Sequence, residues 1–377
     1  MISIIDKHNC CGCNACVQKC PKQCITMRED EEGFLYPSVN LDICIDCHLC
    51  ETVCPCLNQE GAKEPIVCLA AKNIDEDIRK HSSSGGIFIS IAKKVIQEGG
   101  IVFGARFDDR WQVMHDFAET YEDAAAFRGS KYVQSKIRET FKQAEAFLKK
   151  GRRVLFSGTP CQILALNRFL RKKYDNLLTI EVVCHGVPSP KVWQSYLQYI
   201  NPNHKQITAI NLRDKSRGWK HYSYLIQTQE ENLVDDYAAS SLYLRGFSSN
   251  MTLRPSCYRC PAKGLSSGAD ITLADCWGIE NLQGYHDDDK GISAVLANTP
   301  EAMRLLGQLN FASREIDYAF VTRYNPSIVH SPIEPFYRKF FWRCFPQHGI
   351  GAVEVVFQRL KNPLYKLINK LMTFLQK

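Results

Sequence analysis

Two cysteine runs near the N-terminus constrain this chain more than any other feature of its sequence. Cys10, Cys13, Cys16 and Cys20 follow the spacing C-x2-C-x2-C-x3-C and precede Pro21. The same spacing returns at Cys44, Cys47, Cys50 and Cys54, and Pro55 follows it. A disulfide scaffold, a zinc site and an iron–sulfur loop are the three kinds of structure that crowd thiols in this way.

The cellular compartment distinguishes a disulfide scaffold from a zinc or iron–sulfur site. The opening residues "MISIIDKHNCCG" lack the basic start and apolar core of an export signal, so we expect a cytoplasmic protein. Disulfides are rare in a reducing cytoplasm, which favours a metal or redox role for the thiols. No apolar run reaches the roughly 18 residues that span a bilayer.

The spacing of the cysteines distinguishes a zinc site from an iron–sulfur site. Zinc sites usually pair two short knuckles across a longer gap, which fits a double eight-cysteine repeat poorly. The run is instead typical of bacterial two-cluster ferredoxins, in which the fourth cysteine of each run ligates the other cluster. We therefore predict two 4Fe-4S clusters. One is held by Cys10, Cys13, Cys16 and Cys54, and the other by Cys44, Cys47, Cys50 and Cys20.

The N-terminal module is predicted to be an α+β ferredoxin domain over residues 1–57. Between the runs, "CITMREDEEGFLYPSVN" indicates a hairpin with an acidic turn closed by Gly33. Each proline ends a short helix after its run. Three cysteines remain outside the pattern, Cys11, Cys24 and Cys56, and we interpret them as small buried fillers. Residues 57–65 are polar and punctuated by Gly and Pro, as in a linker.

The region 66–300 is predicted to be an α/β domain with a mostly parallel sheet. "PIVCLAAK", "IVFGARFD" and "LLTIEVVCHGVPSP" contain predicted strands, and "SGGIFISIAKKVIQEGG" and "IRETFKQAEAFLKKG" indicate helices. "RRVLFSGTPCQILALNRFLRKKY" has the pattern strand, tight turn, helix. Strands that alternate with helices favour a parallel sheet.

Two turns of this region are weak candidates for anion binding. "HSSSGG" (81–86) begins a helix, where hydroxyls and free N–H groups hold phosphates. "SGTPCQ" (157–162) occupies a strand-to-helix turn, where α/β folds bind ligands. Both turns are also common as plain helix starts. Neither G-x-G-x-x-G nor a Walker loop is present, so a standard Rossmann dinucleotide site is not supported.

A second cysteine set lies in the same region: Cys161, Cys184, Cys257, Cys260 and Cys276. Only Cys257 and Cys260 show ligand spacing. From the residues alone, a third metal site, a zinc knuckle on this pair and isolated packing cysteines all remain open.

Six motifs in order then resemble a known family: "SSSGGIF", "RGSKYVQS", "LFSGTPCQI", "VCHGVPSP", "DKSRGW" and "RPSCYRCPAKGLSSGADITLADCWGI". They are similar to the beta subunits of coenzyme F420 (deazaflavin) hydrogenases and dehydrogenases, a family that 7-hydroxymethyl chlorophyll a reductase also resembles. The resemblance covers residues 1 to about 300. It implies a second domain that binds FAD and a further 4Fe-4S cluster.

The resemblance assigns roles to residues that the spacing leaves open. The implied flavin-site residues are Ser83, Ser84, Gly85, Gly86, Lys131, Tyr132, Gly158 and Thr159. The implied third-cluster ligands are Cys161, Cys184, Cys257 and Cys260, with Cys276 ranked fifth. His81 and His185 lie in flavin-side motifs, where a proton-handling role and a structural hydrogen bond are both open.

The predicted function is a flavin-dependent iron–sulfur oxidoreductase, a subunit of a larger redox complex. Its partner would be a redox protein or a hydride carrier: deazaflavin, nicotinamide or ferredoxin. The alternative is an electron-transfer adaptor without flavin. Of the net charge of +7, residues 336–377 carry +7, so a nucleic-acid-binding face is not indicated.

The C-terminal extension, residues 301–377, ends in a predicted basic amphipathic helix. Leu364, Leu367, Ile368, Leu371 and Leu375 share one face, and Lys366, Lys370 and Lys377 lie mostly off it. Three interpretations stay open: a helix that docks on its own domain, a surface helix that contacts an anionic membrane or an acidic partner, and a disordered end.

Overall fold

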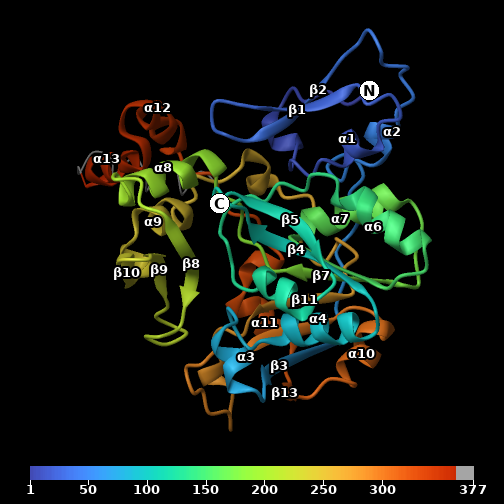
Figure 1. The fold of residues 1–377 in the computed structure, drawn as a ribbon, viewed down its shortest axis with the longest axis vertical. Coiled ribbons are helices and arrows are strands. Elements are labelled where there is room, and N and C mark those ends of the chain that lie inside the picture. The colour runs from blue at the N-terminus through green and yellow to red at the C-terminus, as the bar shows by residue number, and fades with distance from the viewer. Residues whose placement is uncertain (362–377) are drawn as a thin grey trace.

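The computed structural model describes residues 1–361, which form three parts (Figure 1). A cysteine-rich module at the N-terminus lies at one end of a large sheet with its helices. A smaller sheet with the C-terminal helices lies beside both. The amphipathic helix predicted from Pro363 onward lies outside the described residues.

The N-terminal module repeats one local structure twice. A short helix follows each cysteine run, α1 (Ala15–Lys19) after the first and α2 (Leu49–Thr52) after the second. Strands β1 (Ile25–Glu29) and β2 (Leu35–Val39) pair antiparallel. The turn between them ends at Gly33, whose φ of 83° suits a residue without a side chain. The predicted hairpin is therefore confirmed.

The large sheet has eight strands in the order β13-β3-β12-β11-β7-β6-β4-β5. Its centre, from β11 through β7 and β6 to β4, is parallel, which confirms the predicted α/β class. The outer strands β3, β12, β13 and β5 pair antiparallel, so the sheet as a whole is mixed. The strands are β3 (Val67–Asn73), β4 (Ile101–Phe107), β5 (Val113–Ala118), β6 (Val154–Gly158), β7 (Leu177–Val182), β11 (Ile271–Asp275), β12 (Ser293–Ala297) and β13 (Phe311–Glu315).

Helices cover both faces of this sheet because its central strands are apolar on both sides. Leu155 of β6 packs with α4 (Ile87–Gln97), whereas Val154 and Phe156 pack with α6 (Thr140–Lys149) and α7 (Pro160–Leu170). Near-continuous apolar strands are the mark of a sheet buried on both faces. The remaining helices around it are α3 (Glu76–Lys80), α5 (Tyr121–Ala124), α10 (Pro300–Leu306) and α11 (Tyr318–Tyr324).

The third part is an antiparallel sheet that the sequence analysis did not predict. Strands β8 (Ile207–Asp214), β9 (Ser223–Thr228) and β10 (Asn232–Tyr237) form it in the order β10-β9-β8. An aromatic core that includes Trp193, Tyr224 and Phe341 joins the sheet to four helices. These are α8 (Pro190–Ile200), α9 (Leu242–Ser248), α12 (Arg338–His348) and α13 (Ala352–Leu360). Across residues 1–361, no helix combines the length and the apolar character needed to cross a bilayer.

Candidate functional site

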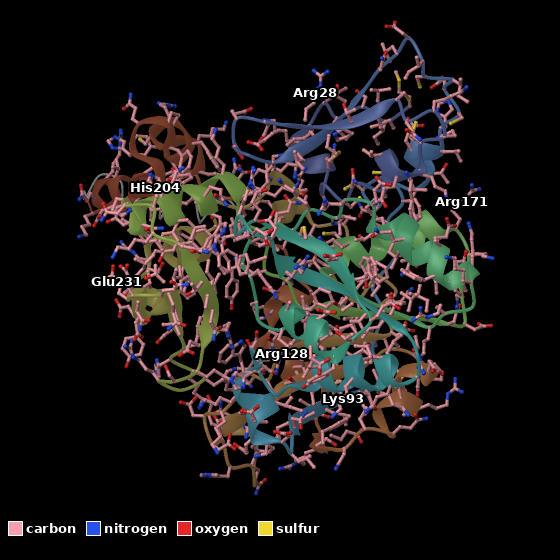
Figure 2. All side chains as sticks on the ribbon, in the orientation of Figure 1. Arg28, Lys93, Arg128, Arg171, His204 and Glu231 are labelled. Atoms are coloured by element: carbon pink, nitrogen blue, oxygen red, sulfur yellow. The ribbon has the colours of Figure 1, made fainter. Side chains whose placement is uncertain are left out.

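Two cavities of the N-terminal module group the cysteines of the runs. Cys10, Cys13, Cys16 and Cys54 line the first cavity, together with Cys11 and Cys56. Cys20, Cys44, Cys47 and Cys50 line the second, together with Cys24. In Figure 2 the sulfur atoms gather in this module and at its boundary with the large sheet. The structure thus groups the thiols in the crossed arrangement, while iron ligation by each of them stays a prediction.

The first cysteine loop lies against the α/β domain. Gln134 Nε2 donates to Cys11 O over 3.0 Å, and Asn14 Nδ2 donates to Arg138 O over 2.8 Å. Gly12 has a φ of 69°, and a Cβ there would lie 2.7 Å from Nη1 of Arg254. Glycine at this position therefore lets the neighbouring domain approach the loop closely.

The second cysteine loop faces outward. Among residues 41–48 only Cys44 is partly covered, and Cys47 is exposed. Leu41, Ile43 and Ile45 expose 64%, 49% and 57% of their surface. The same spacing thus produces one enclosed loop and one open loop.

Four cysteines of the α/β domain converge below the first loop. Cys161 begins α7, Cys184 follows β7, and Cys257 and Cys260 flank the end of a 3-10 helix (Pro255–Arg259). Burial raises the pKa of Cys184 well above its usual value, and Cys257, Cys161 and Cys260 raise it further. Burial likewise raises the pKa of Cys257 to about 11 and that of Cys260 to about 12. The four sulfurs are therefore close enough to interact electrostatically.

Cys11 connects this set to the first loop. The thiols of Cys13, Cys161 and Cys56 raise the pKa of the buried Cys11 thiol well above its usual value, and Cys11 in turn lowers the pKa of Cys161. Cys276 lies apart, in the apolar core with Trp219, Ile279 and Ile292. The four implied ligands thus influence one another electrostatically and Cys276 does not take part, while ligation of a third cluster stays a prediction.

A cavity of about 560 Å³ lies beside this cysteine set. It opens where β6, β7 and β11 end, the edge at which parallel sheets bind ligands. Cys184 and His185 form part of its wall. Seven of the eight implied flavin residues line it: Ser83, Ser84, Gly86, Lys131, Tyr132, Gly158 and Thr159.

Gly85 is the exception, and its role is packing. Its N–H donates to Ser293 Oγ over 3.0 Å, and a Cβ there would lie 2.3 Å from Ala71 O. His81 also stays out of the cavity wall; its Nδ1 contacts Asp77 O on the exposed side. Neither residue faces the cavity in the structure.

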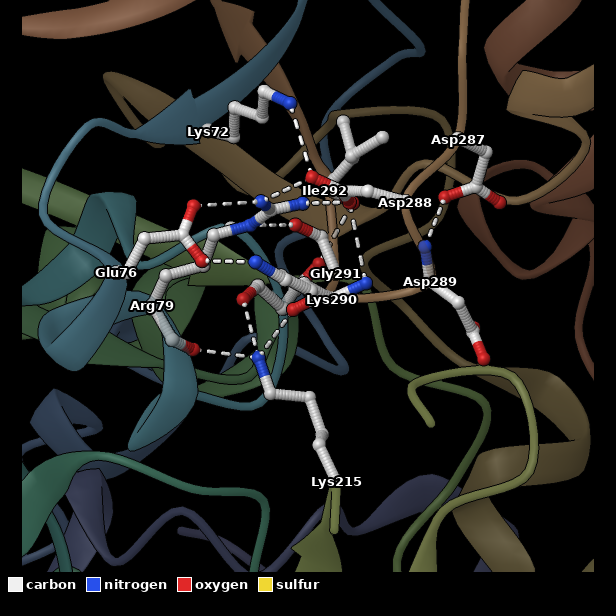
Figure 3. A network of polar contacts seen from close by, with 12 residues as sticks. Lys72, Glu76, Arg79, Lys215, Asp287, Asp288, Asp289, Lys290, Gly291 and Ile292 are labelled. Carbon is white, nitrogen blue, oxygen red and sulfur yellow. Dashed lines mark hydrogen bonds and ion pairs between the residues drawn. The ribbon is translucent and has the colours of Figure 1, made fainter. Parts of the chain in front are cut away.

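A network of hydrogen bonds and ion pairs around Arg79 and Lys215 stabilises the loop 81–86 (Figure 3). Arg79, almost fully buried, donates to Asp288 and to Gly291 O. Lys215 Nζ donates to the carbonyls of Arg79, Ser84 and Lys290 over 2.6, 3.0 and 2.8 Å. Desolvation lowers the pKa of Lys215 to about 8. The loop is therefore fixed by contacts from two distant segments.

The motifs that guided the residue assignments did not include Arg213. It lies at the end of β8 and lines the cavity with 5% of its surface exposed. Nη2 pairs with Asp275 over 3.1 Å and donates to Ser83 O over 3.2 Å. Its Nε is buried and has no partner within residues 1–361. A buried donor without a partner suggests that a ligand bound in the cavity would supply the acceptor.

Two more titratable groups line the cavity, the half-buried Lys131 and the buried His115. Burial lowers the pKa of Lys131 to about 7, and its Nζ donates to Ala126 O and Arg128 O. Burial lowers the pKa of His115 to about 4, and its ring contacts Ser157 O and Ser135 Oγ. His185 contacts Asn250 Oδ1 and Ser327 Oγ, so both of its ring nitrogens have partners.

Sequence comparison assigns the region that carries the cavity and the cysteine set. The family model for the N-terminal part of the coenzyme F420 hydrogenase/dehydrogenase beta subunit matches residues 68–142. The model for the C-terminal part of the same beta subunit matches residues 151–314. Together they match more than half of the sequence. The chain belongs to the family of coenzyme F420 hydrogenase/dehydrogenase beta subunits.

The cysteine-rich module of this family member matches a 4Fe-4S dicluster domain over residues 9–58. An uncharacterised ferredoxin of Methanocaldococcus jannaschii is 35% identical to it over 52 residues, 14% of this chain and 66% of the ferredoxin. The N-terminal part is therefore a two-cluster ferredoxin domain.

Two further relatives match this family member at lower identity. The F subunit of F420H2 dehydrogenase from Methanosarcina mazei is 23% identical over 56% of this chain and 61% of its own length. An uncharacterised protein of M. jannaschii is 26% identical over 46% of this chain and 56% of its own. The match thus spans about three fifths of the length of these curated relatives. A chain of the F420-reducing [NiFe] hydrogenase complex of Methanosarcina barkeri aligns with 80% of this chain and 92% of that one, at 18% identity and a TM-score of 0.47.

Proposed function

We propose that this beta subunit is a flavin-dependent iron–sulfur oxidoreductase that couples hydride transfer at FAD to one-electron transfer through three 4Fe-4S clusters. One observation carries the proposal. The cavity shares Cys184 with the cysteine set, and the same set reaches the first ferredoxin loop through Cys161 and Cys11. A continuous series of redox sites would thus lead from the cavity to the exposed second loop.

The proposed cofactors supply complementary chemistry. A flavin takes up two electrons as a hydride and releases them singly, and a 4Fe-4S cluster carries one electron at a time. The residues of the chain bind and position these groups. Cys161, Cys184, Cys257 and Cys260 would hold the third cluster; the electrostatic coupling of Cys184 to the other three supports this choice.

The cavity residues fit a flavin dinucleotide. The orphaned Nε of Arg213 and the hydroxyls of Ser83 and Ser84 offer donors for phosphate oxygens. Tyr132 and Phe247, whose ring centroids lie 5.5 Å apart, offer apolar surface for a ring system. A volume of about 560 Å³ falls within the range of cofactor sites.

The name of one relative suggests the hydride carrier. The M. mazei enzyme is a dehydrogenase of F420H2, so we propose a deazaflavin as carrier, with nicotinamides and reduced ferredoxin as alternatives. We further propose that a redox partner protein docks on the second cysteine loop. Its apolar residues Leu41, Ile43 and Ile45 alternate with Asp42 and Asp46, which suits a partner with basic residues around an apolar patch.

Anaerobic reconstitution of the full chain with iron, sulfide and FAD tests the proposal. We expect about one FAD and roughly twelve irons per chain. A hydride donor should bleach the flavin first and the clusters afterwards. In Cys257→Ala/Cys260→Ala, the iron content should fall by about four, and the flavin should still be reduced while the ferredoxin clusters stay oxidised. A wild-type chain with full iron and no bound flavin would instead support the adaptor without flavin.

A matched lysine pair tests the flavin site. Lys131 lines the cavity, whereas Lys136 binds Gln112 outside it. Lys131→Met should weaken FAD binding about tenfold, the worth of one charged contact, and Lys136→Met should leave it unchanged. Because Lys131 has a pKa of about 7, wild-type affinity should fall as the pH rises from 6 to 8. Lys131→Arg should remove that pH dependence. An equal loss of FAD affinity in Lys131→Met and Lys136→Met would contradict the proposed flavin site.

A further inference from the structure

Two buried arginines join the ferredoxin domain to the rest of the chain. Arg338 of α12 pairs with Glu32 in the ferredoxin hairpin, and its Nη1 donates to Glu32 Oε1 over 2.8 Å. Both side chains are about nine-tenths buried. The charge of Arg338 is therefore neutralised by a carboxylate at the same interface.

Arg254 lies at the same interface without a carboxylate. Its side chain is 1% exposed. Nε donates to Cys10 O over 2.7 Å, Nη2 to Leu35 O over 2.9 Å, and Nη1 to Gln134 Oε1 over 3.1 Å. All three acceptors are neutral. Its guanidinium also lies 4.3 Å from the centre of the Tyr36 ring. Within residues 1–361 no acidic side chain forms an ion pair with it.

A buried charge without a counter-charge is strongly unfavourable, so the surroundings must supply negative charge. The nearest source is sulfur: Nη2 lies 3.6 Å from Cys10 Sγ. Cys10 is one of the six cysteines that line the first cavity and one of the four predicted ligands of its cluster.

Arg254 also belongs to the turn that carries the third cysteine set. The N–H of Cys257 donates to Arg254 O over 2.9 Å. The backbone of this residue thus supports Cys257, while its side chain reaches Cys10. Gly12 packs so closely against the guanidinium that a Cβ at this position would lie 2.7 Å from Nη1 of Arg254.

We propose that Arg254 is the buried counter-charge of the first ferredoxin cluster and raises the reduction potential of this cluster above that of the second. A 4Fe-4S cluster with four thiolates is anionic and gains a further negative charge on reduction, so a fixed cation beside it stabilises the reduced state. Among the described residues, no arginine lines the cavity with Cys44 and Cys47; its basic residues are Lys22, His48 and the N-terminal Met1, and all three are exposed. The inference rests on the two-cluster assignment and not on bound flavin.

The test compares the two clusters of one molecule in the flavin-free full chain. Arg254→Gln and Arg254→Lys are titrated with dithionite under potentiometric control, and reduction is followed by electron paramagnetic resonance. Cys20→Ala, which should lose the second cluster and keep the first, distinguishes the signals of these two clusters. In Arg254→Gln the equilibrium for electron sharing should shift toward the second cluster by about tenfold or more, the effect of a unit charge at a buried site. Arg254→Lys should keep most of the wild-type ratio.

The neutral double variant Glu32→Gln/Arg338→Gln is the matched control. It removes a buried arginine from the same interface together with its carboxylate, and the electron-sharing ratio should not change. No shift in Arg254→Gln, an equal shift in Arg254→Lys, or an equal shift in the control would overturn the inference. If Arg254→Gln does not retain the first cluster, Arg254→Lys decides: a preserved ratio supports the inference, and a tenfold loss overturns it.

Discussion

The two cysteine loops of the ferredoxin domain have the same local structure and different surroundings. Asn14 and His48 occupy equivalent places before α1 and α2, with φ values of 62° and 58°. Yet Cys10 is buried and Cys13 half-buried, whereas their counterparts Cys44 and Cys47 are half-buried and exposed. The first loop is covered by residues of the α/β domain, and the second meets solvent. Spacing thus determines the backbone of each loop, and the rest of the chain determines its environment.

This difference gives the repeats different roles in the proposed function. The enclosed loop accepts hydrogen bonds from Gln134 and Arg254, and its Cys11 interacts electrostatically with Cys161. The open loop carries Ile43 and Ile45 on its surface and faces a partner. Clusters in low-dielectric surroundings interact more strongly with nearby charges, so the first loop is the one that buried residues can tune.

The largest expected effect is the loss of one cluster. Cys54→Ala should remove the cluster of the first loop, and Cys20→Ala that of the second, because each residue lines the cavity of the other run. Each variant should lose roughly four irons. Iron analysis and paramagnetic resonance of the two proteins measure the loss.

The surviving cluster identifies the arrangement. If Cys20→Ala kept the cluster of the second loop and lost that of its own run, the crossed assignment would be wrong. Replacement of Cys276, which lies in an apolar core away from both cavities, is the control and should leave the iron content unchanged.

The next effect concerns the interface that encloses the first loop. Arg338→Gln leaves Glu32 buried without its cation, which should cost about 3 to 5 kcal/mol of stability. Urea denaturation followed by fluorescence measures this cost. Glu32→Gln/Arg338→Gln should recover most of it, because no uncompensated charge remains. A double variant as unstable as the single one would show that the ion pair itself is required.

A smaller effect is expected at the open loop. Ile43→Ser/Ile45→Ser should slow electron transfer to a basic acceptor protein, with cytochrome c as the probe, about tenfold while the iron content stays full. Ile66 and Ile74 are similarly exposed, at 51% and 56%, and lie on the α/β domain. Ile66→Ser/Ile74→Ser is therefore the control. Equal slowing in both proteins would place the docking site elsewhere.

The smallest effect is expected at the extra cysteine beside each cavity. Cys11 lies with the first cavity, and Cys24 Sγ lies 3.3 Å from Cys20 Sγ beside the second. Replacement of either by serine should keep all the iron and cost about 1 kcal/mol, since a hydroxyl can adopt the same hydrogen bonds. Thermal unfolding and iron analysis check both. Loss of a cluster in one variant would make that residue a ligand and not a filler.

Regular patterns made the ferredoxin domain and the large sheet predictable. The eight run cysteines, the hairpin and the helix after each run follow from spacing and turn residues. The strands β3, β4, β6 and β7 and the helices α4, α6 and α7 were visible because apolar residues recur with one period over whole segments. The antiparallel outer strands were not, since the direction of a strand depends on connections and not on its residues.

Contacts between distant segments could not be predicted in this way. The sheet β8-β9-β10 carries β-bulges and mixed polar residues, so its alternation is weak. Seven implied flavin residues do converge on one cavity, but Arg213 stands just before a motif and has no distinguishing neighbour in sequence. Arg254 lies three residues before Cys257, and only the fold shows that it reaches Cys10.

The closure of the first loop by residues far along the chain sets an order for biogenesis. Arg254 follows Cys10 by 244 residues, and Arg338 follows Glu32 by 306. At ribosomal rates of 5 to 20 residues per second, the first loop is complete roughly 12 to 50 s before Arg254 is made. During this interval the loop is as accessible to a cluster-delivering scaffold as the second loop is in the finished protein. When the later domain folds, it covers the first loop. The metal of this loop would therefore have to be delivered before that step.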